Sequence, residues 1–248
     1  MSILGLTRSV VRRDHALVTA ESHVAAPLAG WTAAQGVVLV SPRMGARFSQ
    51  TLVDMEVGAA SGPALPGVER FVWVLKGRIR LAVGHDEHDL GPAGYALLPA
   101  DAPHRIAARE ISRLLVVEKP YVPLAGVAAP GPVVGHESDV HGTPLEGDPD
   151  IEVRLLVPEA HAFDLAVNTM AYVPGAALPF VEVHVMEHGL WMLEGRGVYR
   201  LSDAWYPVGP GDAIWMAPHC PQWFCAYGRE PAKYLIYKDW NRDPLTAA

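Results

Sequence analysis

Two histidines and a glutamate lie close together in the last third of the chain, at a spacing that suits metal binding. They are Glu182, His184 and His188, in the stretch from Gly175 to Gly195. Side chains two residues apart in an extended strand point to the same face, so Glu182 and His184 share a face, and His188 has the same parity. A carboxylate and two imidazoles that converge on one point are typical of a nitrogen and oxygen site for a divalent cation.

A fourth ligand must come from a neighbouring strand, because one strand cannot surround an ion. Gln222, in the stretch PHCPQWF, is suitably placed after the next expected hairpin, and its amide oxygen is a hard, neutral donor. His219 is the alternative ligand, but it lies three residues earlier and has the opposite strand parity. Four protein ligands leave about two open positions on an octahedral ion, enough for a small substrate or a water. Without a thiolate ligand, we expect Mn²⁺, with Fe²⁺ or another divalent ion as alternatives.

These residues belong to the second copy of an internal repeat. When the chain is shifted by 118 positions, residues 69–103 fall on residues 187–221. The match pairs a Glu, a Trp and a Leu of one copy with the same residues of the other, and Gly and Pro recur at shared turn positions. The chain is therefore interpreted as a tandem duplication.

Each copy shows the pattern of short strands. Residues 73–83 and 191–201 alternate apolar and polar side chains around a Gly, which predicts a half-buried hairpin in each copy. The 22 Pro and 23 Gly residues indicate many tight turns, and helical periodicity is weak. We therefore predict an all-β protein made of two tandem jelly-roll β-barrels.

The predicted domains follow from the repeat. Residues 1–121 are expected to form an N-terminal barrel together with an N-terminal extension whose role the pattern does not define. Residues 122–145, rich in Pro, Gly and Ala, are expected to connect the barrels, and residues 146–248 to form the C-terminal barrel with the metal and the active site.

The first copy serves as an internal control for the metal prediction. The four ligand positions of the second copy fall there on Ala64, Pro66, Arg70 and His104. Three of these side chains cannot bind a metal ion. The first barrel is therefore predicted to be metal-free and to act as a scaffold.

Composition excludes several other classes. The net charge is −7, from 20 basic and 27 acidic residues, and no basic stripe is present, so nucleic acid is not an expected partner. The N-terminus contains neither a secretory signal nor a membrane span. Cys220 and Cys225 are interpreted as buried thiols in a reducing compartment. A soluble, cytoplasmic protein is expected.

At this point the motifs show a family resemblance. The pattern G-x6-E-x-H-x3-H-x6-G followed by G-D-x5-P-x3-Q resembles the two cupin motifs, with Gln222 in place of the usual His of the second motif. Together with the stretches FVEVHVMEHG, YLIYKDWNRDP and TRSVVRRDHALVTAESHV, it resembles the (S)-ureidoglycine aminohydrolase family of bicupins over nearly the whole chain.

The resemblance implies an activity and further site residues. It implies metal-dependent hydrolytic deamination of (S)-ureidoglycine to (S)-ureidoglycolate and ammonia, a step of allantoin and purine breakdown. It also implies that Tyr199, Tyr234 and Lys238 contact the substrate's carboxylate and ureido groups. Lys238 and the metal ligand Glu182 are the expected catalytic residues, the latter for a proton transfer. The expected partner is a small-molecule substrate, with a homo-oligomeric assembly by analogy.

Two alternatives stay open. The chain could be another metal-dependent cupin enzyme, a dioxygenase or an isomerase, which oxygen consumption with an aromatic or diketone substrate would reveal. It could also be a non-catalytic bicupin that binds a small ligand, although it has no helix-turn-helix or basic patch to transmit a signal.

Overall fold

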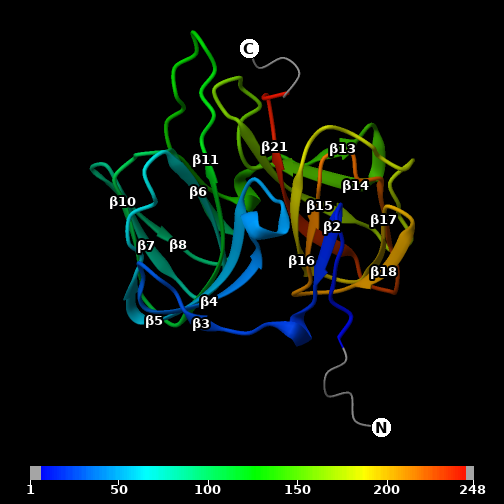
Figure 1. Cartoon of the computed structure of the whole chain (residues 1–248), viewed down its shortest axis with the longest axis horizontal. Coiled ribbons are helices and arrows are strands. Elements are labelled where there is room, and N and C mark those ends of the chain that lie inside the picture. Colours follow the sequence, from blue (N-terminus) through cyan, green and yellow to red (C-terminus); the bar gives the residue numbers. More distant parts are fainter. Residues whose placement is uncertain (1–6, 244–248) are drawn as a thin grey trace.

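The computed structural model describes residues 7–243 and consists of two β-barrels that lie side by side (Figure 1). The outer ends of the two predicted domains, residues 1–6 and 244–248, lie outside the described residues. Helix in the described part is limited to three 3-10 segments, at Ala20–Ser22, Pro42–Met44 and Glu137–Asp139. The predicted all-β bicupin fold is confirmed.

The first barrel is formed by one ten-stranded sheet with the order β12-β9-β6-β11-β5-β10-β7-β8 and with β3 and β4 off this path. Its strands are β3 (Ala26–Pro27), β4 (Thr32–Val40), β5 (Ser49–Ala60), β6 (Val68–Lys76), β7 (Ile79–Val83), β8 (Asp86–Leu90), β9 (Gly94–Leu98), β10 (His104–Ala108), β11 (Ser112–Pro120) and β12 (Val133–His136).

The second barrel has two sheets, with the orders β1-β2-β19-β16-β21-β15-β14-β13 and β18-β17-β20. Its strands are β1 (Val10–Val11), β2 (His15–Val18), β13 (Thr143–Leu145), β14 (Asp148–Leu155), β15 (Leu165–Tyr172), β16 (His188–Glu194), β17 (Gly197–Leu201), β18 (Ala204–Val208), β19 (Ala213–Met216), β20 (Gln222–Ala226) and β21 (Ala232–Asp239).

The predicted hairpins at residues 73–83 and 191–201 are wrong. β6 pairs with β9 and β11, whereas β7 pairs with β8 and β10, so the two strands do not pair with each other. The chain turns a corner between them at Gly77, which has a φ of +80° and where a Cβ would lie 2.3 Å from the Ile111 carbonyl oxygen. Gly195 makes the same corner in the second barrel, with a φ of +65°. Glycine is required at both positions because of this conformation and close approach.

The two barrels exchange their leading strands. β2 pairs with β19 of the second barrel, and β12 pairs with β9 of the first. The N-terminal extension, predicted with residues 1–121, therefore adds two strands to the second barrel, and the predicted connection 122–145 adds one strand to the first. Each added strand covers a sheet edge that would otherwise expose unpaired backbone groups.

A hydrophobic core fills each barrel, and a third core lies between them. The core between the barrels includes Phe71 and Trp73 of β6 and Trp191 of β16, whereas Leu190 and Met192 of β16 face the inside of the second barrel. The central strands are therefore buried on both faces, which explains their nearly continuous apolar sequence. Within residues 7–243, no helix has the length and hydropathy needed to cross a membrane.

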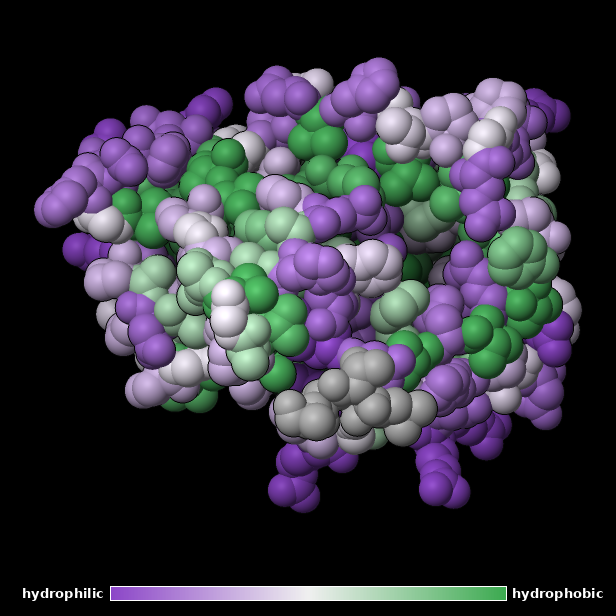
Figure 2. Space-filling model, turned by 90° about the horizontal axis from the view of Figure 1, so that it is seen from above, coloured by the Kyte–Doolittle hydropathy of each residue, from purple (hydrophilic) through white to green (hydrophobic). Residues whose placement is uncertain are grey.

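Seen from above, the surface mixes hydrophilic and hydrophobic residues (Figure 2). Some of the exposed apolar side chains flank the predicted metal ligands: Phe180, Val181 and Val183 are exposed by 54%, 36% and 57%. Alternation with the half-buried Glu182 and His184 places Val181 and Val183 on the outer face of the same segment.

Candidate metal centre

Three of the four predicted ligands converge on the fourth, His184. Its Nε2 lies 3.0 Å from Gln222 Nε2, 3.3 Å from His188 Nε2 and 3.8 Å from Glu182 Oε2. The four side chains come from the irregular segment before β16, from the first residue of β16 and from the first residue of β20. Residues that lie 40 positions apart in sequence thus meet at one point of the second barrel.

Backbone pairing explains this convergence. Glu182 and Gln222 form an isolated antiparallel bridge, in which each donates its N–H to the carbonyl of the other, at 2.8 and 2.9 Å. Directly opposed residues of such a pair present their side chains on the same face. The sequence predicted strand geometry at Glu182 and His184, with room for a bend or a turn before His188. The segment from Glu182 to His188 is irregular apart from this bridge.

His219, the alternative ligand, contributes through its backbone. Its N–H donates to the His184 carbonyl at 2.8 Å, which fixes the position of the segment that carries His184. The residue has a φ of +62° and is exposed. The presence of His219 in the second motif is therefore explained by its backbone role in a turn.

The donor set fits a divalent cation. Adjacent ligands of an ion with bonds of about 2.1 Å lie about 3 Å apart, close to the spacing between these side-chain atoms. The amide nitrogen of Gln222 cannot bind a cation, but a half-turn of the amide presents its oxygen to the same point. A carboxylate, two imidazoles and an amide oxygen suit Mn²⁺ or Fe²⁺.

Burial keeps His188 neutral. Desolvation lowers the pKa of its imidazole well below the ordinary value, and the nearby charges of His184 and Lys238 lower it further. The neutral imidazole is the form that binds a metal. The environment of His188 therefore favours the ligand state.

Lys238 lies beside His188 on the neighbouring strand. The two residues are paired in register between β16 and β21. Burial lowers the pKa of Lys238, while the carboxylates of Glu159 and Glu182 act in the opposite direction. Its Nζ lies 4.7 Å from the ring centroid of Trp240, a cation–π contact that holds the ammonium group in place.

Three tyrosines lie in the barrel beneath the candidate ligands. The Tyr199 hydroxyl lies 3.4 Å from the side-chain amide of Gln222, and the hydroxyl groups of Tyr234 and Tyr172 lie 2.6 Å apart. Burial raises the pKa of each hydroxyl above its ordinary value, and Glu182 adds to the effect at all three. The hydroxyls therefore stay protonated and can donate hydrogen bonds.

Sequence analysis missed Tyr172 and Trp240. Tyr172 carries no motif and lies 62 residues from Tyr234, so only the fold shows their contact. Trp240 has the strand parity of Lys238, two residues earlier, and this spacing is a signal that could have indicated the cation–π contact.

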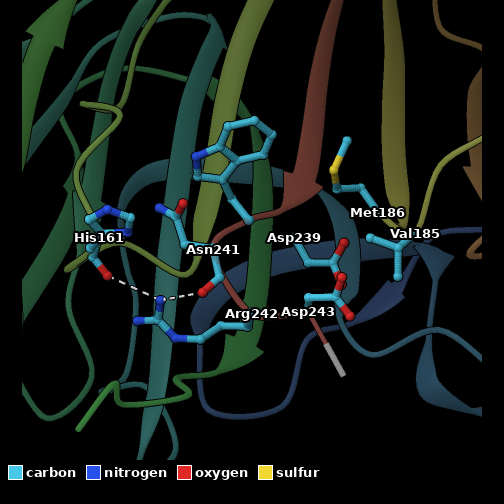
Figure 3. A pocket seen from close by; sticks show the side chains of 8 residues that line it. His161, Val185, Met186, Asp239, Asn241, Arg242 and Asp243 are labelled. Carbon is cyan, nitrogen blue, oxygen red and sulfur yellow. Dashed lines mark hydrogen bonds between the residues drawn. The ribbon is translucent and has the colours of Figure 1, made fainter. Parts of the chain in front are cut away.

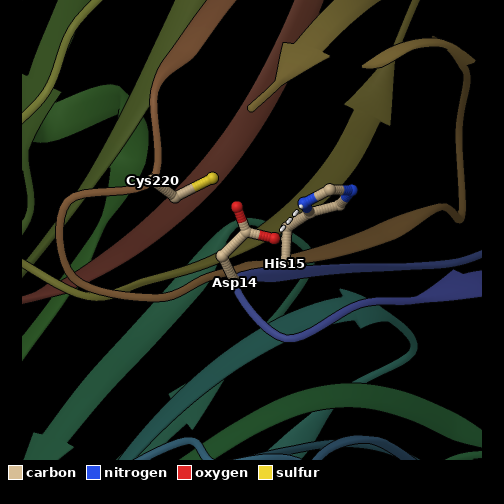
Figure 4. Close-up of side chains that lie close together, drawn as sticks. All are labelled: Asp14, His15 and Cys220. Carbon is tan, nitrogen blue, oxygen red and sulfur yellow. Dashed lines mark hydrogen bonds and ion pairs between the residues drawn. The ribbon is translucent and has the colours of Figure 1, made fainter. Parts of the chain in front are cut away.

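A second group of possible metal ligands lies near the start of β2 (Figure 4). The ligand atoms of Asp14, His15 and Cys220 lie within 4.8 Å of one another. Both ring nitrogens of His15 already have partners, Asp14 at 2.9 Å and the Tyr206 hydroxyl at 2.9 Å. Burial raises the pKa of the Cys220 thiol to about 11. These contacts account for the group as a hydrogen-bonded cluster with a protonated thiol.

A pocket of about 330 Å³ borders the segment between His184 and His188 (Figure 3). Arg242 crosses one side of it and donates to the carbonyl oxygens of His161 and Asn241, at 3.0 and 2.8 Å. The residues that line the pocket are His161, Val185, Met186, Asp239, Trp240, Asn241, Arg242 and Asp243.

Comparisons with known proteins agree with this geometry. A family model described as a cupin domain matches residues 168–237, which include all four candidate ligands. In order of chain position, the matched region begins in β15 and ends in β21. It therefore covers most of the second barrel.

Curated relatives match nearly the whole chain. A probable (S)-ureidoglycine aminohydrolase of Oryza sativa is 43% identical over 97% of this chain and 78% of its own length. The (S)-ureidoglycine aminohydrolases of Arabidopsis thaliana and Escherichia coli are 41% and 31% identical, over 97% and 95% of this chain and 80% and 92% of their own lengths.

Solved structures match over both barrels. The protein Ylba from Escherichia coli superposes with a TM-score of 0.85 at 29% identity, over 97% of each chain. An oxalate decarboxylase of Bacillus subtilis, with a TM-score of 0.70 at 11% identity over 91% of this chain and 77% of its own, shares the fold alone. With the curated relatives, these matches confirm the resemblance seen in the sequence: the chain belongs to the (S)-ureidoglycine aminohydrolase family of bicupins.

Proposed function

We propose that the chain hydrolyses (S)-ureidoglycine to (S)-ureidoglycolate and ammonia with the help of a bound divalent cation, and that Mn²⁺ is this cation. The convergence of Glu182, Gln222 and His188 within 3.8 Å of His184 Nε2 carries the proposal. The 31–43% identity to curated members of the family supports the choice of substrate. As proposed, the enzyme works in allantoin and purine breakdown, in the cytoplasm and as a homo-oligomer.

Glu182, His184, His188 and Gln222 would hold the cation. When bound, a divalent cation supplies Lewis acidity and a fixed template for a small chelating substrate. The segment that carries three of these residues is fixed at both ends, by the Glu182–Gln222 bridge and by the pairing of β16. The ligands are therefore held in place before substrate arrives, which limits the ordering cost of binding.

Charged and polar groups next to the ligands suit the substrate. Lys238 pairs with its carboxylate, and the protonated hydroxyls of Tyr199 and Tyr234 donate to its oxygens. Burial strengthens each of these contacts, because they are shielded from water. Together they orient the central carbon so that one face is open to water.

The reaction replaces a C–N bond by a C–O bond. The oxygen of water attaches to the central carbon, the amine nitrogen leaves, and the proton from water ends on ammonia. The carboxylate of Glu182 carries this proton between the two, since the tyrosines stay protonated and the lowered pKa of buried His188 disfavours proton uptake by its imidazole.

The test is ammonia release from freshly prepared (S)-ureidoglycine, with metal-free protein and with protein reloaded with Mn²⁺. We expect release well above the spontaneous rate only with Mn²⁺, and one enantiomer of ureidoglycolate. A no-enzyme control is needed because the substrate decays spontaneously.

An ammonia rate at the level of that control, from protein that has bound Mn²⁺, would reject the proposed reaction. Oxygen uptake with aromatic or diketone substrates would then identify a dioxygenase. Fe²⁺ and Zn²⁺ reloading in parallel decides whether Mn²⁺ is the preferred ion.

A further inference from the structure

One residue of the first barrel contacts residues that lie next to the candidate metal centre in sequence. Arg47 lies between the 3-10 helix Pro42–Met44 and β5. Its backbone N–H donates to both carboxylate oxygens of Glu187, at 3.1 and 3.0 Å, and its Nε donates to Glu187 Oε2 at 3.3 Å. Its guanidinium also pairs with Asp239.

Glu187 and Asp239 are also tied to each other. The Glu187 N–H donates to Asp239 Oδ1 at 2.6 Å, and the Asp239 N–H donates to the Glu187 carbonyl at 3.2 Å. The indole N–H of Trp215 donates to Glu187 Oε1 at 2.7 Å. The side chain of Glu187 is fully buried, so its charge depends on these partners for compensation.

These two acidic residues directly precede and follow residues of the site. Glu187 is the neighbour of His188, and Asp239 is the neighbour of Lys238, which pairs with His188 in register. Adjacent residues of a strand point to opposite faces. Arg47 lies between the barrels and contacts both Glu187 and Asp239. It therefore fixes one end of β16 and one end of β21, and the opposite face of these two strands carries His188 and Lys238.

The first barrel also packs directly on the residue after His188. A Cβ on Gly189 would lie 2.6 Å from the Gln50 side-chain oxygen and 2.6 Å from the Phe48 ring. Gln50 donates to the Leu190 carbonyl at 3.2 Å. The first barrel thus contacts Glu187, Gly189 and Leu190, on both sides of His188 in the sequence.

We propose that Arg47 is a positioning residue, through which the first barrel holds His188 and Lys238 in the geometry needed for metal and substrate binding. The inference rests on the proposed metal centre. It gives the first barrel a role in the site beyond support of the fold. Partners behind metal ligands typically change metal affinity or activity by 10–100-fold when they are removed.

The same interface contains a matched control. Glu69, which the 118-residue shift places on Glu187, is buried beside Lys119 at 3.5 Å, and Lys119 also pairs with Asp164 of the second barrel. This second triad, like the first, joins two acidic residues and one basic residue across the interface. Glu69 precedes Arg70 and not a predicted metal ligand, so loss of this second triad should affect stability alone.

The experiment is a titration of metal-free protein with MnCl₂, in which the electron paramagnetic resonance signal of free Mn²⁺ reports the dissociation constant. We expect Arg47→Ala to raise this constant by about 10-fold or more. We expect Arg47→Lys, which keeps the charge but not the two-pronged contact, to give a smaller rise. Lys119→Met should lower the urea midpoint yet leave the Mn²⁺ constant within about twofold of wild type.

Two outcomes would overturn the inference. One is folded Arg47→Ala protein with a wild-type Mn²⁺ constant and wild-type kcat; if that variant does not fold, Arg47→Gln takes its place. The other is an equal loss of Mn²⁺ affinity in Lys119→Met, which would mean that any loosening of the interface disturbs the centre. Ammonia release by wild-type protein tests the proposed function separately, because the Mn²⁺ titrations decide the role of Arg47 whatever the substrate is.

Discussion

The two barrels carry different side chains at the same strand positions. In the second barrel, His188 of β16 is paired in register with Lys238 of β21. In the first barrel, Arg70 of β6 is paired in register with Glu118 of β11. The 118-residue shift places Arg70 on His188 and His104 on Gln222.

A guanidinium thus lies where the second barrel has an imidazole. Arg70 is 2% exposed, it contacts His104 Nε2 at 3.0 Å, and it pairs with Glu118 at 2.8 Å. Its positive charge is permanent, because arginine does not lose its proton in proteins. A duplicated position can thus carry either an arginine cation with a carboxylate partner or, as proposed for His188, a ligand for a metal cation. The prediction that the first barrel binds no metal rests on this difference.

The largest expected effect comes from the histidines of the two barrels. His184→Ala removes the side chain on which the other ligands converge, and we expect loss of Mn²⁺ binding and a fall in ammonia release by about 10²-fold or more. His104→Ala in the first barrel should change neither. Metal content by elemental analysis and kcat/KM check both variants, and Mn²⁺ loss in His104→Ala would contradict the division of roles.

Lys238 and an exposed lysine of the first barrel test the charge in the site. We expect Lys238→Ala to lose about 10²-fold in kcat/KM, because a half-buried cation that pairs with the substrate carboxylate is removed, while Mn²⁺ stays bound. Lys76→Ala, on an exposed position of the first barrel, should keep the wild-type rate. Steady-state kinetics on Mn²⁺-loaded protein gives the comparison, and an undiminished Lys238→Ala rate would remove this residue from the site.

Arg70→Ala tests how much the buried guanidinium of the first barrel contributes to stability. Removal of the guanidinium leaves Glu118 and His104 without their partner, and we expect a loss of about 2–4 kcal/mol in the free energy of unfolding. Mn²⁺ affinity should not change. Urea denaturation measures the loss. The matched control is Arg113→Ala, which breaks an exposed ion pair with Asp54 and should cost less than about 1 kcal/mol; equal losses would show that the burial of Arg70 has no energetic consequence.

The last expected effect is a pH dependence of stability from Glu69. Burial, together with the nearby Asp164, raises the pKa of Glu69 to about 9. The folded state therefore holds a proton that the unfolded state loses above its ordinary pKa, so stability is greatest at low pH and declines as pH rises towards 9. The slope is at most about 1.4 kcal/mol per pH unit. Glu69→Gln should flatten it in urea denaturation series between pH 6 and 9, and an unchanged slope would show that Glu69 is not the source.

The features predicted from the sequence are those that leave a local or repeated pattern. The 118-residue repeat indicated two barrels, and the spacing of Glu182, His184 and His188 indicated one face of a strand. Gln222 was found because the second motif has a fixed spacing. The structure brings these four side chains together, with a bridge and an irregular segment in place of regular strand geometry at Glu182 and His184.

The features that were missed depend on contacts between distant segments. Arg47 lies 140 residues from Glu187, and nothing in the surrounding periodicity indicates the contact. The corner at Gly77 was taken for a hairpin, because a turn between two sheets and a turn within one sheet both favour Gly. The N-terminal strand was assigned to its sequence neighbours, whereas the free edge of β19 determines where it pairs.

The exchange of leading strands has a consequence for folding. β2 and β19 pair across about two hundred residues, since Ala16 is the partner of Trp215. A chain emerging from the ribosome completes the first barrel once β12 is available, but its own earliest strand must wait for almost the whole remaining sequence. Contacts between such distant residues close late and slowly. Until then the N-terminal strand and the edge of β19 are both unpaired, so the interval before they meet is when this protein is most exposed to pairing with another chain.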